Sequence, residues 1–166
     1  MERPDMRHTA LEPLTERNLE EARGIDRSDV PEDFVDTVDE LMELTRYGLE
    51  HRCAGRTYVV RCEGACAGVI LLGEAIPWDT DPEVMRGRPF YRLMGFMIDR
   101  RYRGQGLGAW ALEEAVRRVY GEFGPRPIAL GCHRDNGGGQ RFWLSRGFSK
   151  TDAMEGEDFY YIRELP

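Results

Sequence analysis

The sequence predicts a mixed α/β fold in a single domain. Two observations indicate this: short apolar runs of strand length recur along the chain, and amphipathic stretches with the period of a helix lie between them. A chain of 166 residues has the length of one domain. It contains no internal repeat, linker or low-complexity segment, so we expect one domain over residues 1–166.

The N-terminal part predicts a strand followed by two helices. Residues 8–15 alternate apolar and polar side chains, as a strand does. Thr15 is placed to cap a helix that runs through residues 18–26. Pro31 suits the first turn of a second helix over residues 32–50. Helical spacing gives this second helix a buried stripe of five residues: Phe34, Val38, Leu41, Met42 and Thr45.

The middle of the chain predicts three strands. Residues 57–62 and 66–73 are rich in strand-forming residues and are joined by a short turn that contains glycine, so we expect a hairpin. Cys62 and Cys66 flank this turn, and free thiols are expected there rather than a disulfide. Residues 75–89 form a loop rich in proline and aspartate, and the apolar residues 91–98 form a strand buried on both faces.

The C-terminal part predicts two helices and three strands. A charged segment and a glycine-rich turn separate them from the preceding strand. The helices are expected over residues 107–120 and 136–146, and the strands over residues 127–132, 148–151 and 158–165.

Composition and charge narrow the classes of function. The chain is 41% hydrophobic and 32% charged with a net charge of −7, which is typical of a soluble protein and unfavourable for binding nucleic acid or an anionic membrane. No run of 18 apolar residues occurs and the first residues lack the core of a signal peptide, so we expect no membrane contact and a cytoplasmic location. The four cysteines form no Cys-x-x-Cys pair, so we expect no metal site.

A glycine-rich turn between a strand and a helix is the clearest chemical signal. It reads Arg103-Gly104-Gln105-Gly106-Leu107-Gly108. Glycines let backbone N–H groups converge on a ligand, and the helix N-terminus adds partial positive charge there. The turn therefore favours an anion such as a pyrophosphate, with a plain turn as the alternative. Its glycine spacing differs from that of dinucleotide-binding and nucleoside-triphosphate-binding loops.

These residues resemble the GNAT acetyltransferase superfamily. The turn matches the superfamily's Arg/Gln-x-x-Gly-x-Gly/Ala signature, and a second pattern is matched by Asn136, Phe142, Gly147 and Phe148. The resemblance implies a GNAT-like α/β fold, with a central mixed and mostly antiparallel sheet of six to seven strands and about four helices. Within the superfamily, residues 96–99 resemble those of bacterial spermine/spermidine acetyltransferases.

The resemblance also implies how acetyl-CoA is bound. Backbone amides of residues 104–108 would hold the pyrophosphate, with Arg103 at the edge. The backbone of Phe96, Met97 and Ile98 would pair with the pantetheine arm, and an N–H near Met97 or Ile98 would stabilise the oxyanion. Asn136 would contact the pantetheine, cap its helix, or do both.

Two departures from the family pattern leave the proton donor open. Gly139 replaces the usual alanine, and Trp143, in the expected CoA-binding region, replaces a tyrosine thought to protonate the leaving thiolate. Indole is no useful acid. Tyr160 and Tyr161 are substitute candidates, against a purely structural role in their strand. Alternatively, the thiolate leaves without an acid, since a thiol pKa of about 8.5 makes it a tolerable leaving group.

The base is equally open. An alkylamine with a pKa of about 10.4 is protonated at pH 7, and removing the proton costs about 5 kcal/mol. No carboxylate lies in residues 92–95 of the central strand. Glu74, at the end of the preceding strand, is the first candidate for a catalytic base. Asp99 and His133 are weaker candidates, for which structural roles are the alternative.

The acceptor side carries acidic residues. Glu32, Asp33 and Asp36, with the loop residue Trp78, are candidate substrate-binding residues for a cation, against a solvated helix face and a plain loop. We therefore expect an N-acetyltransferase that moves acetyl from acetyl-CoA to a small-molecule amine, preferably a polyamine or diamine, by direct attack. The alternatives are a protein N-terminus, an amino acid or an aminoglycoside as acceptor, or a non-catalytic CoA-binding sensor. The sequence leaves a homodimer open.

Overall fold

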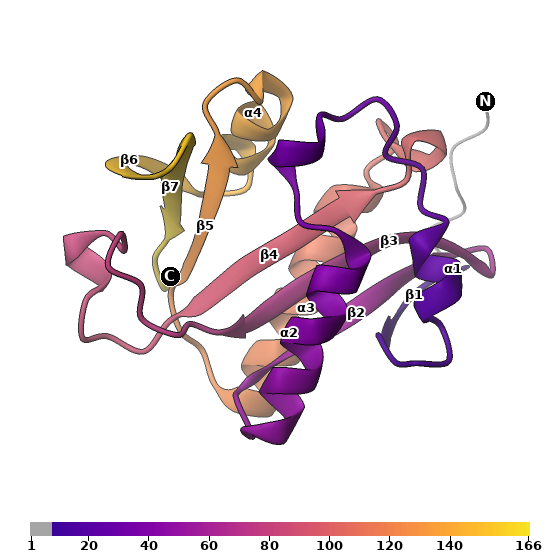
Figure 1. Cartoon of the computed structure of the whole chain (residues 1–166), viewed down its shortest axis with the longest axis horizontal. Helices are drawn as coiled ribbons and strands as arrows, with labels where there is room; N and C mark the ends of the chain where they lie inside the picture. Colours follow the sequence, from indigo (N-terminus) through magenta and orange to yellow (C-terminus); the bar gives the residue numbers. More distant parts are fainter. Residues whose placement is uncertain (1–7) are drawn as a thin grey trace.

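The computed structural model describes residues 8–166, in which seven strands form one sheet in the order β1-β2-β3-β4-β5-β7-β6 (Figure 1). The strands are β1 (Thr9–Pro13), β2 (Gly55–Cys62), β3 (Ala65–Glu74), β4 (Tyr91–Ile98), β5 (Ile128–His133), β6 (Ser149–Glu155) and β7 (Asp158–Arg163). The α-helices of these residues are α1 (Leu19–Arg23), α2 (Val38–Glu50), α3 (Leu107–Phe123) and α4 (Gly137–Ser145). This fold class and this order of elements are the ones that the sequence predicts.

Helices cover both faces of the sheet, with α2 on one face and α3 on the other (Figure 1). Successive strand residues point to opposite faces of the sheet, so neighbouring apolar residues of a strand pack into separate hydrophobic cores. Val59 and Val69 pack with α1 and α2, whereas Val60 and Ile70 belong to the core beneath α3. The buried stripe of α3 is Leu107, Ala111, Leu112, Ala115, Val116 and Val119, as its periodicity predicts.

β4 and β5 form the parallel pair of the sheet, and they separate soon after they begin. Their pairing consists of Tyr91 with Ile128 and Arg92 with Ala129. Beyond these pairs the two strands diverge toward their C-terminal ends, as Figure 1 shows. A ligand at this edge therefore reaches backbone groups of β4 that no neighbouring strand occupies.

A β-bulge in β4 accompanies the divergence. Val69 of β3 pairs with Met97, but Leu71 pairs with Met94, so β4 carries one extra residue in this interval. Gly95 lies there with a φ of +61°, a conformation that favours glycine. A Cβ at this position would lie 2.3 Å from Cδ2 of Leu41, which α2 packs against the bulge. The bulge thus depends on a residue without a side chain.

The start of each of the two N-terminal helices differs from the prediction. Thr15 does not cap α1, which begins after Asn18; the Asn18 side chain instead accepts a hydrogen bond from the Thr15 amide at 2.8 Å. The expected helix over residues 32–50 is interrupted: Glu32–Phe34 is a short 3-10 helix, η2, and α2 begins only at Val38.

A capping box sets the later start of α2. The Thr37 hydroxyl accepts from the Glu40 amide, and the Glu40 carboxylate accepts from the Thr37 amide, both at 3.1 Å. Arg27 donates to the carbonyl groups of Val35 and Asp36, which holds the intervening segment in a non-helical path. The segment of residues 24–37 is consequently a strap that crosses from α1 toward the end of β5 (Figure 1).

The hairpin and the cysteines follow the prediction more closely. Glu63 and Gly64 have φ values of 51° and 82°, as expected for a two-residue hairpin turn with both central residues left-handed. Cys62 faces the core beneath α3, whereas Cys66 packs against the core beneath α2. The two thiols therefore lie on opposite faces of the hairpin, and all four cysteines are free.

We expect Gly95→Ala to destabilise the protein by about 2 to 4 kcal/mol, because it adds both left-handed strain and overlap with Leu41. Gly64→Ala is the matched control: its φ is also positive, but a Cβ there meets nothing within 4 Å, so strain alone should cost about 1 kcal/mol. Urea unfolding measures both. Equal losses for the two variants would show that Leu41 does not hold the bulge.

Candidate functional site

Two cavities open where β4 and β5 diverge. One, of about 660 Å³, lies beside the glycine-rich turn and is called the turn cavity; Arg103, Gly104, Gly106 and Gly108 line it. The other, of about 720 Å³, lies between the strap and the β6–β7 hairpin and is called the acidic cavity. Phe34, Val35, Phe96, Asn136, Gly139 and Phe142 line both. The two cavities therefore meet above the splayed strands.

The turn cavity is shaped to receive an anion. Gly104 and Gly106 have φ values of +76° and +86°, and a Cβ on either residue would meet no atom within 4 Å. Gly106 is also the N-cap of α3, where no side chain caps the helix. The 17-residue helix α3 thus presents its N-terminal N–H groups and its dipole toward this space.

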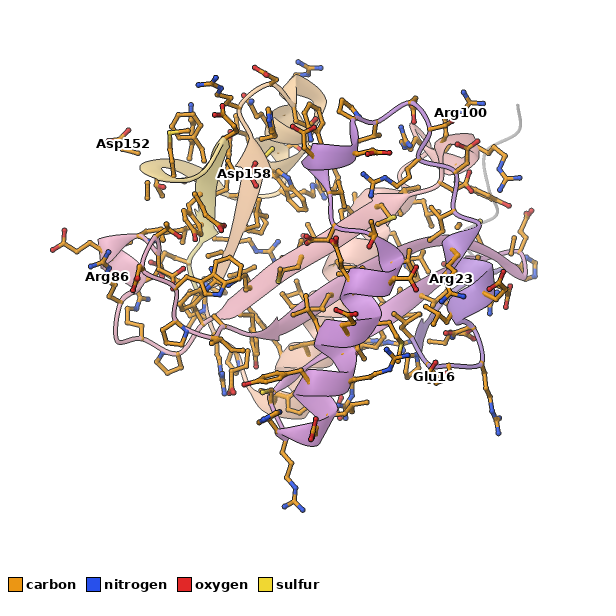
Figure 2. All side chains as sticks on the ribbon, viewed as in Figure 1. Glu16, Arg23, Arg86, Arg100, Asp152 and Asp158 are labelled. Atoms are coloured by element: carbon orange, nitrogen blue, oxygen red, sulfur yellow. The ribbon has the colours of Figure 1, made fainter. Side chains whose placement is uncertain are left out.

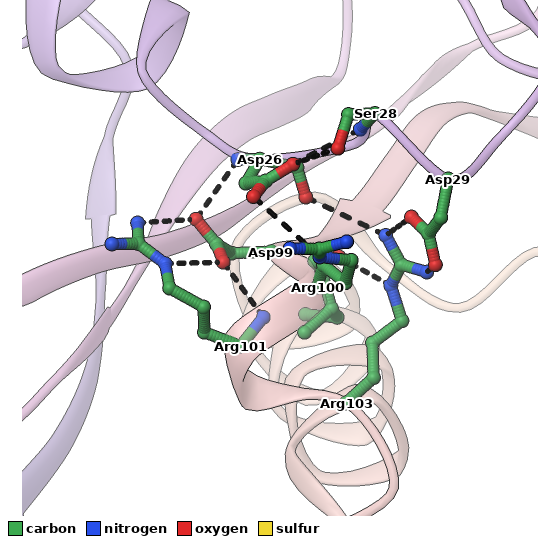
Figure 3. A network of polar contacts seen from close by, with 8 residues as sticks. Asp26, Ser28, Asp29, Asp99, Arg100, Arg101 and Arg103 are labelled. Carbon is green, nitrogen blue, oxygen red and sulfur yellow. Dashed lines mark hydrogen bonds and ion pairs between the residues drawn. The ribbon is translucent and has the colours of Figure 1, made fainter.

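Arg103 is held by the strap. Its guanidinium makes a bidentate ion pair with Asp29, with N···O distances of 2.6 and 2.8 Å, and its Nε donates to the Ile98 carbonyl at 2.8 Å (Figure 3). The sequence suggested that Arg103 adds a full positive charge at the edge of an anion site. In the structure Arg103 instead connects the strap to the end of β4 at the wall of the turn cavity.

Asp99 is a structural residue and not a base. It is fully buried and accepts hydrogen bonds from the Arg101 side chain, the Arg101 amide and the Asp26 amide (Figure 3). The hydrogen bonds from the Arg101 side chain lower the pKa of Asp99 to about 2. Asp99 lines neither cavity, so its carboxylate serves to join the strap to the short helix Arg100–Tyr102.

The wall that joins the two cavities is aromatic. The rings of Phe96 and Phe142 stack with centroids 5.8 Å apart, and Trp143 contacts Phe142 edge-on at 4.9 Å. Met97 and Ile98 continue β4 along the floor of the turn cavity. Trp143 is buried in this cluster and lines the acidic cavity, so its indole is a packing element next to the splayed strands.

Asn136 caps α4 at the mouth of both cavities. Its Oδ1 accepts from the Gly139 amide at 2.9 Å. A Cβ on Gly139 would lie 2.5 Å from Nδ2 of Asn136. Glycine at this position, where the family pattern has alanine, therefore gives the capping side chain its room.

Carboxylates surround the acidic cavity on two sides. The strap and the start of α2 supply Glu32, Asp33, Asp36 and Glu40, and the β6–β7 hairpin supplies Glu155, Glu157 and Asp158. Burial and the neighbouring carboxylates raise the pKa of Asp36 and of Asp158. Burial and the neighbouring carboxylates thus outweigh the opposing effect of Arg27 on Asp36 and of His133 on Asp158, which is an arrangement suited to a cationic ligand.

The floor of the acidic cavity carries a neutralised ion pair. Buried Arg92 forms two hydrogen bonds with buried Asp81, at 2.8 and 3.2 Å. The Trp78 ring lies 3.7 Å from the Arg92 guanidinium carbon, so the ring that the sequence suggested for a substrate cation already faces an arginine. The Tyr160 hydroxyl contacts the same pair, at 3.3 Å from Asp81, and Thr80 at 2.9 Å.

Two of the three predicted catalytic residues lie outside the cavities. Glu74 pairs with Arg126 at 3.2 Å and lines a third cavity at the C-terminal end of α2, which shares Trp78, Arg92 and Met94 with the acidic cavity. Tyr161 is buried in the core beneath α3. Strand alternation explains the second result, because adjacent Tyr160 and Tyr161 must face opposite sides of β7. Tyr160 alone of the three lines the acidic cavity.

His133 has both ring nitrogens engaged. Its Nδ1 accepts from the Asp135 amide at 3.1 Å, which places the proton of the neutral ring on Nε2. Nε2 lies 3.3 Å from Asp33, and the ring of Phe34 packs on the imidazole with centroids 4.7 Å apart. His133 therefore anchors η2 to the end of β5 and has no free lone pair for a substrate.

Sequence reasoning missed three features of the site: the bulge at Gly95, the Arg92–Asp81 pair and Asp158. Asp158 follows the Gly156-Glu157 turn and lies on the same face of β7 as Tyr160, two residues on. Every second residue of a strand faces the same side, so the candidate Tyr160 would have indicated that Asp158 also faces the site. Arg92 and Asp81 are separated by 11 positions along the chain, across a loop, and no local sequence pattern predicts their ion pair.

Known proteins share this fold. The model of the acetyltransferase (GNAT) family matches residues 19–148, whereas no curated protein matches the chain. The PaiA N-acetyltransferase from Thermoplasma acidophilum in complex with coenzyme A is similar at 17% identity, with a TM-score of 0.69 over 95% of this chain and 99% of that chain.

Two further solved structures are similar at the same level. The ribosomal alpha-N-protein acetyltransferase RimL in complex with coenzyme A is 14% identical, with a TM-score of 0.71 and coverage of 95% of this chain and 94% of that chain. The NatC complex bound to Gag peptide and CoA is 17% identical, with a TM-score of 0.67 over 96% and 99%. At these identities the likeness is one of fold.

The described residues contain neither a helix that could span a membrane nor a cluster that could bind a metal. No helix within residues 8–166 is long and apolar enough to cross a membrane. In the same residues, no three His, Cys, Asp or Glu side chains gather so that they could hold a metal ion.

We expect Asp36→Asn to raise the free energy of unfolding at pH 7. Because folding raises the pKa of Asp36, this carboxyl stabilises the folded state at a pH below its pKa in the unfolded chain. The contribution is lost as the pH rises through its pKa in the folded state. The neutral amide removes this electrostatic penalty. Urea titrations from pH 3 to pH 7 measure this, with exposed Asp152→Asn as control. A gain independent of pH would contradict the electrostatic cause.

Proposed function

Because the chain belongs to the acetyltransferase (GNAT) family, an enzyme family that uses acetyl-CoA, we propose that its acceptor is a diamine or polyamine. The acidic cavity is the observation that supports this acceptor. Seven carboxylates from the strap, α2 and the β6–β7 hairpin line it, and the Arg92 charge on its floor is compensated by Asp81. A ligand with several ammonium groups matches such a wall, because each group finds a carboxylate.

The cofactor side is proposed to work through the backbone. The amides of residues 104–108 and the N-terminus of α3 hold the diphosphate of acetyl-CoA. The pantetheine arm follows β4, where residues 96–98 offer backbone groups that β5 does not occupy. An N–H beside the Gly95 bulge then faces the thioester oxygen and stabilises its developing negative charge.

Transfer is proposed to be direct. The lone pair of the neutral amine attacks the thioester carbonyl carbon, the C–S bond breaks, and the products are CoA and the N-acetyl amine. Cys132 lines the acidic cavity, but burial raises the pKa of its thiol to about 11, so little thiolate exists to form an acetyl-enzyme. A ternary complex of both substrates is therefore the productive state.

Tyr160 is the tyrosine proposed to protonate the leaving sulfur. It lines the acidic cavity, and burial raises the pKa of its phenol, so the hydroxyl is protonated at neutral pH. Trp143 offers no such proton. The hydrogen bonds to Thr80 and Asp81 fix the hydroxyl on the floor of the cavity.

We expect Gly106→Asp to weaken CoA binding at least about 100-fold. A carboxylate about 4 Å from a phosphate charge costs about 4 kcal/mol near a protein surface. Gly64→Asp is the matched control, because its φ is also positive and Gly64 lines neither cavity. Calorimetric titration with CoA measures both. Undiminished affinity in folded Gly106→Asp would place the diphosphate elsewhere.

A comparison of amines tests the acceptor. We expect 1,4-diaminobutane and spermidine to accelerate thiol release from acetyl-CoA with a lower KM than butylamine, and their advantage to shrink as salt screens the carboxylates. Release of CoA thiol is followed with a thiol reagent. If a peptide N-terminus or an aminoglycoside reacts and the diamines are inert, the acceptor is wrong. If CoA binds and no amine accelerates release, the chain acts as a sensor.

A further inference from the structure

We infer that Asp158 is the catalytic base that removes the proton from the acceptor ammonium. The inference rests on the proposed amine acceptor and names the residue that its chemistry requires. An alkylammonium has no lone pair, so a group in the cavity must take one proton before the nitrogen can attack. The base expected from the sequence, Glu74, is paired with Arg126 and does not line the acidic cavity.

Asp158 lies against the strand that borders the splay. It begins β7 opposite His133, and its carboxylate leans over the neighbouring Gly131 of β5. A Cβ added to Gly131 would lie 3.2 Å from Oδ2 of Asp158, so the missing side chain leaves space next to this oxygen. Gly131 is exposed on the floor of the acidic cavity, and an amine there would meet the carboxylate directly.

Asp158 is also uncommitted. Within residues 8–166 its carboxylate has no hydrogen bond or ion pair within bonding distance, whereas Asp33 faces His133 at 3.3 Å and Glu157 pairs with Arg134 at 2.6 Å. Among the carboxylates of the acidic cavity, only Asp36 and Asp158 are half-buried; the others are exposed. Asp36 belongs to the strap, so Asp158 is the half-buried carboxylate that lies next to β5.

The charges that face Asp158 favour this role. Burial raises its pKa first, and Glu155 from β6 with Asp36 and Asp33 from the strap raise it further, while His133 on β5 opposes them. A carboxylate with a raised pKa accepts a proton more readily near neutral pH. His133 itself is no rival, because its Nδ1 is occupied by the Asp135 amide and its Nε2 carries a proton.

The proton balance closes without any further reactant. Asp158 takes one proton from R–NH3+, directly or through one water, and the resulting R–NH2 forms the N–C bond. As the C–S bond breaks, Tyr160 gives its proton to the sulfur and yields CoA thiol, and the second nitrogen proton restores the Tyr160 hydroxyl. Asp158 then returns its proton to solvent, so that one ammonium and acetyl-CoA give one amide, CoA and one proton.

The test compares Asp158→Asn with Asp152→Asn. Asp152 is exposed on β6 and lines neither cavity; Figure 2 shows it at the outer edge of the hairpin, away from Asp158. With 1,4-diaminobutane, kcat of Asp158→Asn should fall at least about 100-fold. CoA affinity should stay within about two-fold of wild type, and Asp152→Asn should keep wild-type kcat. Asp158→Glu, which retains a carboxylate over Gly131, should recover part of the rate.

An acceptor amine that is already neutral distinguishes two roles of Asp158: removal of a proton from the ammonium, and electrostatic attraction of the ammonium. With a fluorinated alkylamine that is unprotonated at pH 7, the kcat loss of Asp158→Asn should shrink to less than about ten-fold. An equal loss with both amines, or a rise in KM with unchanged kcat, would overturn the inference and make Asp158 an anchor. Wild type that acetylates no amine would overturn the proposed acceptor and the inference together, whereas active wild type with unimpaired Asp158→Asn overturns the inference alone.

Discussion

The divergence of β4 from β5 is the constraint on which the rest of the site depends. A continuous sheet would use every N–H and C=O of β4 in its ladder and leave nothing for a ligand. Here the parallel pairing ends after Arg92, and an extra residue at Gly95 bends β4 away. Leu41 fills the space that a side chain on Gly95 would need, so the packing of α2 and the opening of the sheet depend on the same glycine.

In the proposed function, the opening separates two ligands of opposite charge. On one side, uncapped N–H groups at the start of α3 favour the diphosphate of the cofactor. On the other, carboxylates of the strap and the β6–β7 hairpin favour an ammonium. The strap lies between them, tied to the turn by the Arg103–Asp29 pair and to β5 by the Asp33–His133 contact. Its position therefore links the cofactor side of the site to the acceptor side.

The sequence could predict elements that have a local periodic pattern and residues that belong to a family motif. The apolar stripe of α3, the hairpin and the turn of residues 104–108 each carry their own signal, and the structure agrees with them. Thr37 and Glu40 have the spacing of a capping box, which indicates that α2 begins after Thr37. The helical spacing of Phe34 instead favoured an earlier start. Glu74 could not be excluded as a base, because its partner Arg126 comes from a distant segment, whereas the main partner of Asp99 is the neighbouring Arg101. The Arg92–Asp81 pair depends on the fold of a loop.

A crystal structure with a bisubstrate analogue tests the central claim most directly. In this analogue the CoA sulfur is joined through an acetyl bridge to one nitrogen of spermidine. We expect its diphosphate oxygens about 2.7–3.2 Å from amide nitrogens of residues 104–108, its arm along β4, and its free ammonium groups among the carboxylates of the acidic cavity. An analogue bound with the diphosphate away from that turn, or with the polyamine outside the acidic cavity, would contradict the account.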